Sequence, residues 1–291
     1  MLQPLPESTP EPLFAAHERS YAANRYVYPV ISRRAGGLSI GVNLNLDKFC
    51  NFHCVYCQVD RTSSGEDASL DLTRLATELD EMLRLSVSSR LFDGPRFAHT
   101  PPQLRRLNDI AFSGDGEPTA SAAFPQAVEV CAEARRRFRL DALKLVLITN
   151  ASLFHHPRVS AALEVLDRNN GEIWAKLDAG SEEYYRRVNR SQVPWRQILA
   201  NLRAAAAVRS LVIQTLLMRL HGAPPLPAEI ISYCERLQEI IAAGGRIKLV
   251  QLHTLARPPA EAWVSALMAA ELEAIAAEVH KRTGLPVATF P

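Results

Sequence analysis

The chain has 291 residues, of which 47% are hydrophobic and 22% are charged, and its formal net charge is +2 at pH 7. This composition is ample for a hydrophobic core, and it excludes a broadly polybasic protein that binds nucleic acid by bulk charge. No window of about 20 apolar residues occurs, so no membrane span is expected. The chain begins without an apolar signal stretch, and we therefore expect a cytoplasmic protein.

Residues 1–37 are expected to form an N-terminal arm, because their first part is rich in proline and charged side chains. Residues 38–44 alternate with a period of two, which predicts a strand that leads into a cysteine-rich loop. A polar connection over residues 61–68 follows. The next segment places large apolar side chains on one helical face, with Ser69 or Asp71 as the N-cap.

Strands and helices then alternate along the chain. Further strands are predicted over residues 109–113, 143–148, 172–177, 211–216 and 246–252. Further helices are predicted over residues 122–138, 157–168, 181–188, 195–208, 227–242 and 260–280. This alternation is typical of an α/β protein with a parallel sheet.

Six strand–helix units are too few to close an eight-stranded barrel. The expected fold is therefore a partial (βα)6 TIM-like barrel over residues 38–262. Residues 263–291 are expected to form a C-terminal helix and tail that pack on this barrel.

Three of the five cysteines fall within eight positions, and Cys50, Cys54 and Cys57 have the spacing C-x3-C-x2-C. Thiolates bind iron–sulfur clusters, so three of them on one loop can hold three corners of a [4Fe–4S] cluster. The fourth iron is then open to a substrate or cofactor. A zinc site that includes His53 is the alternative, although the paired spacings typical of structural zinc sites are missing from the sequence.

The cysteine spacing resembles the signature of the radical S-adenosylmethionine (radical SAM) superfamily, in which an aromatic or apolar residue precedes the third cysteine, as Tyr56 does here. The resemblance implies a [4Fe–4S] cluster whose open iron binds the amino and carboxylate groups of SAM. It also implies reductive cleavage of SAM to a 5′-deoxyadenosyl radical, which abstracts hydrogen from a substrate. The same resemblance implies the partial-barrel fold and places Tyr56 near the adenine.

Chemistry in such barrels gathers beyond the carboxyl ends of the strands. The second predicted strand ends in Gly114, Asp115, Gly116 and Glu117. Backbone carbonyls and a carboxylate there can accept hydrogen bonds from the methionine ammonium group. The segment resembles the family's GGE motif, although Asp115 separates the two glycines, and an ordinary tight turn is the alternative.

Later strand ends supply further candidates. Asn150 follows the third strand, where it can meet ribose hydroxyls or cap the next helix. Lys176 and Asp178 alternate along the fourth strand and so share one face. They are expected to form an ion pair or to make two cofactor contacts, Lys176 to the methionine carboxylate and Asp178 to a ribose hydroxyl or the substrate. Gln214 and His253 are candidates at the ends of the fifth and sixth strands.

Several segments resemble the Fe–S oxidoreductase branch that includes tRNA 4-demethylwyosine synthases, among them LHTLARPP at residues 252–259 and Asn189-Arg190. Those enzymes carry a second cluster on cysteines upstream of the radical motif, whereas no cysteine precedes Cys50 here. Cys131 and Cys234 lie among apolar residues in predicted helices and are expected to fill the core. A single cluster is therefore expected.

An enzyme of this kind needs an external one-electron donor such as flavodoxin or ferredoxin. The substrate is expected to be a small molecule or a tRNA base. Paired arginines such as Arg33-Arg34 could line an RNA-binding rim, although the sequence contains no RNA-binding module. Two alternatives stay open: an activase that acts on a glycyl-radical enzyme as protein partner, and a non-catalytic zinc or Fe–S binding module.

Overall fold

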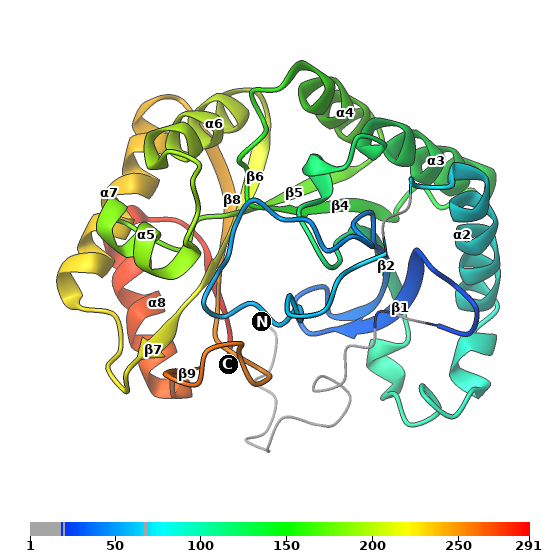
Figure 1. Ribbon diagram of the computed structural model, residues 1–291, viewed down its shortest axis with the longest axis horizontal. Coiled ribbons are helices and arrows are strands. Elements are labelled where there is room, and N and C mark those ends of the chain that lie inside the picture. The colour runs from blue at the N-terminus through cyan, green and yellow to red at the C-terminus, as the bar shows by residue number, and fades with distance from the viewer. Residues whose placement is uncertain (1–18, 20, 67–68) are drawn as a thin grey trace.

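The structure is a computed structural model that describes residue 19 and residues 21–66 and 69–291. Within these residues, eight strands form one curved sheet in the order β1-β2-β3-β4-β5-β6-β8-β10 (Figure 1). The strands are β1 (Val27–Ser32), β2 (Gly37–Val42), β3 (Leu107–Phe112), β4 (Lys144–Thr149), β5 (Gly171–Lys176), β6 (Ser210–Leu216), β8 (Arg246–His253) and β10 (Val287–Phe290). Neighbouring strands are parallel except for β1 and β2.

Most helices cover the outer, convex side of this sheet (Figure 1). They are α2 (Leu72–Val87), α3 (Phe124–Arg137), α4 (Pro157–Arg168), α5 (Glu182–Asn189), α6 (Trp195–Val208), α7 (Pro227–Ala242) and α8 (Ala269–Thr283). The short strands β7 (Met218–Leu220) and β9 (Val264–Ala266) pair antiparallel outside the main sheet. Among the described residues, no helix combines the length and the hydropathy that crossing a bilayer requires.

The partial barrel expected from the sequence is confirmed. The six predicted strands correspond to β2, β3, β4, β5, β6 and β8, and the helix predicted over residues 157–168 is α4 with the same bounds. In the described residues, β1 and β10 form the two edges of the sheet and do not pair with each other. The barrel is therefore open along one seam.

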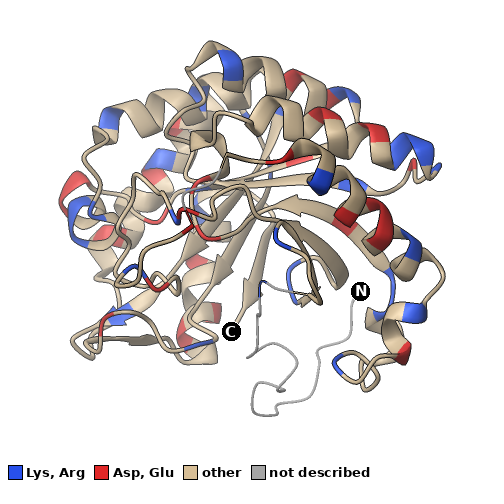
Figure 2. Ribbon diagram, turned by 45° about the vertical axis from the view of Figure 1, so that its right-hand side comes forward, with Lys and Arg blue, Asp and Glu red and all other residues tan. Residues whose placement is uncertain are grey.

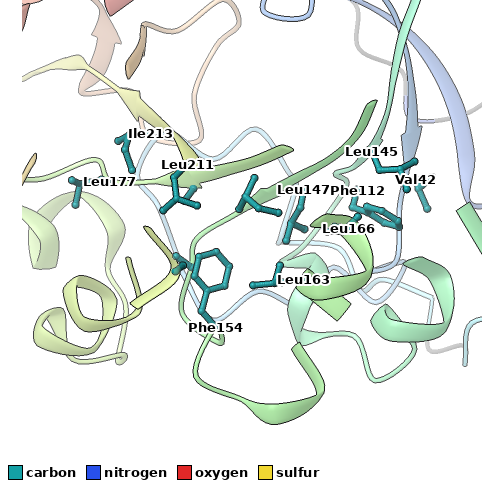
Figure 3. Packing of buried hydrophobic residues seen from close by; sticks show 14 of the residues in the cluster. Val42, Phe112, Leu145, Leu147, Phe154, Leu163, Leu166, Leu177, Leu211 and Ile213 are labelled. Atoms are coloured by element: carbon teal, nitrogen blue, oxygen red, sulfur yellow. The ribbon is translucent and has the colours of Figure 1, made fainter. Parts of the chain in front are cut away.

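Alternation along each strand separates the core from the barrel interior. Figure 3 shows Leu147 of β4 near Leu163 of α4 and Leu145 of β4 near Phe112 of β3, and all four side chains are buried. Val146, between the two leucines, instead packs with Trp174 in a separate cluster. The helix-facing side chains thus build the main core, and the concave face remains for a cavity.

Asp71, rather than Ser69, is the N-cap of α2. Its carboxylate accepts a hydrogen bond from the backbone N of Arg74 at 3.0 Å. The apolar stripe that follows is buried as predicted, with Leu75 and Leu79 fully inaccessible.

The prediction of one helix over residues 260–280 is wrong at its start. Residues Val264–Ala266 form β9, and α8 begins only at Ala269. Glu271 fixes that start, because its carboxylate accepts from the backbone N of Met268 at 2.8 Å. Val264 packs in a small apolar cluster with Leu220, so its apolar character belongs to the β7–β9 pair and not to a helical face.

The two edge strands are absent from the sequence-based prediction. β1 lies in the predicted N-terminal arm, of which residues 1–18 and 20 fall outside the described residues. β10 lies in the predicted C-terminal tail and pairs with β8. Both strands are stabilised by pairing with a neighbouring strand.

Candidate functional site

The segment that follows β2 carries the three cysteines across the open side of the sheet (Figure 1). Backbone hydrogen bonds hold this segment to the end of α5. The N of His53 donates to the O of Asn189 at 3.0 Å, and the N of Val55 donates to the O of Val188 at 2.9 Å. The loop is thereby fixed near the carboxyl ends of the strands, where barrel enzymes place their active sites.

A cavity of about 320 Å³ opens beside this loop. Its lining includes Cys50, Cys54 and Cys57 and nine of the ten residues predicted to contact a cofactor. These nine are Tyr56, Gly114, Asp115, Gly116, Glu117, Asn150, Lys176, Gln214 and His253. Asp178, the tenth, does not line the cavity and lies behind Tyr56.

The three clustered cysteines suit a multi-iron cluster. Cys50, Cys54 and Cys57 are partly exposed on the cavity wall, whereas Cys131 and Cys234 are buried in α3 and α7. A [4Fe–4S] cluster can take each thiolate on a separate iron.

The environment of Cys50 favours the thiol over the free thiolate. Burial, and then the charge of Glu117, raises the pKa of the Cys50 thiol to about 12. A metal bound to this sulfur would favour the thiolate.

Two side chains point donors at the cysteine sulfurs. Nδ2 of Asn189 lies 3.5 Å from Sγ of Cys54 and 2.9 Å from Oδ2 of Asp178. A guanidinium nitrogen of Arg61 lies 3.8 Å from Sγ of Cys57. Hydrogen bonds to sulfur help to set the reduction potential of a cluster. The sequence names Asn189 only within a family resemblance, because its local pattern does not show that α5 ends beside Cys54.

Tyr56, Lys176 and Asp178 form one hydrogen-bonded group next to the cysteines. The Tyr56 hydroxyl donates to Oδ2 of Asp178, while Nζ of Lys176 lies 2.7 Å from that hydroxyl and 3.9 Å from the carboxylate. Burial, with Asp178 and Cys54 adding to it, raises the pKa of Tyr56, so the phenol stays neutral. Burial alone lowers the pKa of Lys176, but Asp178 and the cysteines raise it overall. Lys176 therefore presents an ammonium group to the cavity.

The glycines of the segment after β3 are needed for close packing against the cysteine loop. A Cβ on Gly114 would lie 2.2 Å from Oδ1 of Asn43, and one on Gly116 would lie 2.0 Å from the O of Phe49. Both distances are too short for any larger residue. Asp115 accepts from Nδ2 of Asn43 at 2.6 Å, so the residue that interrupts the glycine pair also holds the two segments together.

The carboxylate of Glu117 is buried and joins the ends of β3 and β4. Oε1 accepts from N and Oγ1 of Thr119 at 3.1 and 2.6 Å and from Oγ1 of Thr149 at 2.6 Å, and Oε2 accepts from the N of Asn150 at 2.8 Å. Burial raises the pKa of Glu117, although these hydrogen bonds oppose the increase. Oε2 has one partner and keeps room to accept a second donor.

Asn150 does not cap α4. Its Nδ2 donates to Oδ1 of Asn51 at 2.7 Å, and its Oδ1 accepts from the N of Ser152 at 3.0 Å. The cap of α4 is His156, whose ring nitrogen accepts from the N of Arg158. Asn150 therefore ties the end of β4 to the cysteine loop.

Several buried nitrogens on the cavity wall lack a partner within the described residues. They are Nδ1 of His253, Nε of Arg61 and Nε of Arg257. Gln214 differs, since its Nε2 donates to Oε1 of Gln251 at 3.3 Å. Buried polar groups are normally hydrogen-bonded, so unpartnered ones mark a place where a ligand completes the set. The wall thus has both thiols and free polar groups for a cofactor.

The model of the radical SAM superfamily matches residues 44–221, which is more than half of the chain. The chain belongs to this superfamily, as the cysteine spacing indicates. Enzymes of the superfamily use a [4Fe–4S] cluster and SAM.

A UPF0026 protein of Methanocaldococcus jannaschii is 29% identical over 169 residues, which are 56% of this chain and 43% of that protein. The chain therefore spans less than half the length of this curated relative. A structure of TYW1 with a bound lysine–pyruvate adduct has a TM-score of 0.53 at 18% identity, and the match covers 85% of this chain and 74% of the TYW1 chain. A radical SAM methyltransferase from Sphaerobacter thermophilus has a TM-score of 0.61 at 13% identity, and the match covers 91% of this chain and 68% of the methyltransferase chain. Both structures share the partial-barrel fold.

Proposed function

We propose that Cys50, Cys54 and Cys57 hold one [4Fe–4S] cluster and that the chain cleaves SAM reductively to abstract hydrogen from a substrate. The observation that carries this proposal is the position of the three thiols on one cavity wall together with the ammonium group of Lys176. When bound, the cluster supplies one electron that breaks a carbon–sulfur bond of SAM and yields the 5′-deoxyadenosyl radical.

The residues of the chain then bind and orient SAM. Lys176 attracts the methionine carboxylate, and Asp178 holds Lys176 and Tyr56 in place from behind the wall. The ring of Tyr56 offers a surface for the adenine. Oε2 of Glu117 and the carbonyls of Gly114 and Gly116 accept from the methionine ammonium group.

Three further wall residues complete the proposed SAM contacts. Asn150, Gln214 and His253 are candidates for the ribose and the substrate, and all three line the cavity. His253 is the best placed of the three to gain a hydrogen bond, because its buried Nδ1 has no partner in the described residues.

Of the two expected substrate classes, we propose a small molecule. The cavity of about 320 Å³ is within the range of roughly 300–1,000 Å³ for ligand pockets. Reduction of the cluster needs an external donor, for which we propose flavodoxin or ferredoxin. The side chain of Phe49, next to Cys50, is 55% exposed and gives such a donor an apolar contact close to the cluster.

The test is the release of 5′-deoxyadenosine. Protein reconstituted with iron and sulfide without air is mixed with SAM and dithionite, and the product is measured by mass spectrometry. Wild type and the control Cys234→Ala should release 5′-deoxyadenosine, whereas Cys54→Ala should not. Release from Cys54→Ala at the wild-type rate, or none from wild type with full iron content, would disprove the proposal.

A further inference from the structure

The lining of the cavity also includes Arg34 from the turn between β1 and β2, together with His253 at the end of β8 and Arg257 after it. The guanidinium carbon of Arg34 lies 5.7 Å from the ring centroid of Trp174, on the concave face of the sheet. We call Arg34, His253 and Arg257 the basic wall.

The lining as a whole has an excess of positive charge. Of the described residues that line the cavity, six are Lys or Arg and three are Asp or Glu. All three acids have internal partners: Glu117 accepts four hydrogen bonds, Asp115 pairs with Arg19, and Asp109 accepts from the hydroxyl of Ser39. Figure 2 shows basic positions inside the curve of the sheet as well as on the outer helices.

Two buried nitrogens of the basic wall lack acceptors. Nδ1 of His253 and Nε of Arg257 are buried with no hydrogen-bond partner in the part of the chain that the structure describes. Burial, followed by the charges of Arg33 and Arg257, lowers the pKa of Arg34 to about 10. The positive charges of these arginines repel one another in a partly desolvated cavity, and a bound anion would reduce that repulsion.

SAM does not supply that anion. It carries an ammonium group, a sulfonium group and one carboxylate, so it adds positive charge to the cavity. Its carboxylate is assigned above to Lys176, whose pKa responds to Asp178 and the cysteines. The pKa of Arg257 responds instead, after burial, to Arg19, Arg33 and Tyr28, so the two cationic groups have different charged neighbours.

We propose that the basic wall binds the carboxylate or phosphate group of a small-molecule substrate that occupies the cavity beside SAM. This inference rests on the proposed function, which assigns the methionine carboxylate of SAM to Lys176. Planar guanidinium groups donate paired hydrogen bonds to either oxyanion. The imidazole of His253 adds one more donor.

The test is calorimetric titration of the reconstituted protein, with and without saturating SAM, using inorganic phosphate and acetate as separate probes at low ionic strength. At least one anion should bind with a stoichiometry of one, and the tighter of the two identifies the group. Arg34→Gln and Arg257→Gln should each weaken binding about tenfold or more, since each removes a charge-assisted hydrogen bond. The control Arg246→Gln, at the exposed opposite end of β8, should bind within about twofold of wild type.

Failure of both anions to bind wild type, or wild-type affinity in both variants, overturns the inference. If one variant fails to fold or to hold iron, the other decides, because the two arginines lie on separate elements. Release of 5′-deoxyadenosine without anion binding refutes only this inference. Anion binding without release refutes the proposed function and leaves the anion site standing.

Discussion

Replacement of Asn189 by leucine tests whether the amide beside Cys54 sets the potential of the cluster. The amide nitrogen lies 3.5 Å from Sγ of Cys54. A donor stabilises the cysteine sulfur more when the cluster carries an additional electron, because the sulfur is then more negative. Loss of the donor should therefore make the cluster harder to reduce.

The size of this effect follows from the strength of the hydrogen bond. A bond to a charged acceptor contributes about 1.5–3 kcal/mol. The oxidised cluster already benefits from part of this energy and sulfur is a weak acceptor, so we expect a difference of about 1 kcal/mol between the two states. A tenfold change in equilibrium constant, about 1.4 kcal/mol, corresponds to about 59 mV for one electron, which gives an expected decrease of about 40 mV.

The measurement is a redox titration of the reconstituted protein without SAM, followed by electron paramagnetic resonance. Asn201→Leu is the matched control, because Asn201 and Asn189 are each 2% exposed and Asn201 also donates two hydrogen bonds, to the O of Ala151 and the O of Ser152. Both variants should lose stability, but only Asn189→Leu should shift the potential. An unchanged potential in Asn189→Leu, or an equal shift in Asn201→Leu, would refute the reasoning.

Three further predictions concern the supporting residues. Gly116→Ala should lower the amount of iron bound per chain, because its Cβ would lie 2.0 Å from the O of Phe49. The control Gly94→Ala should keep the wild-type iron content, since the nearest atom to its Cβ would be 3.6 Å away. Equal iron content in the two variants would contradict this prediction. Glu117→Gln should lower the free energy of unfolding in urea by about 2–3 kcal/mol, because the amide NH2 would face groups that donate hydrogen bonds to the carboxylate. A decrease below about 0.5 kcal/mol would contradict this role of Glu117. Burial raises the pKa of Asp109 to about 6, above the value of about 3.9 in an unfolded chain, so the folded state binds this proton more tightly. The contribution of Asp109 to stability should therefore fall as the pH rises from about 4 to about 6 and then level off, and thermal unfolding of Asp109→Asn should lack this fall; an identical pH profile in both proteins would exclude it.

The fold could be predicted where a segment carries its own pattern. Residues 143–148 are a near-continuous apolar run and form β4, because a strand buried on both faces has few polar positions. Pro157 marks the first turn of α4, which begins at the predicted residue. β9 and β10 have only three and four residues, and their pairing depends on β7 and β8, so their own sequences are too short to predict them.

In the candidate site, too, features that lie in one short segment could be predicted, and those that depend on the fold could not. The three cysteines lie in one short segment, so their spacing alone predicts that they lie together. Lys176 and Asp178 lie 3.9 Å apart, but β5 ends at Lys176, and alternation does not show that Asp178 turns to Tyr56 and away from the cavity. Asn189 and Arg257 reach the site through the fold, from the end of a helix and from the segment after β8, and no local pattern predicts that.

An arginine bridges the open seam of the barrel. Here β1 and β10 are both edges among the described residues, and Arg33 from that turn donates to the backbone O of Pro291, just after β10. The seam is therefore bridged by a side chain, and Arg34 can point inward over Trp174. The turn at the seam thus adds a cation to the lining of the cavity, and the negative group of a ligand would be oriented toward it.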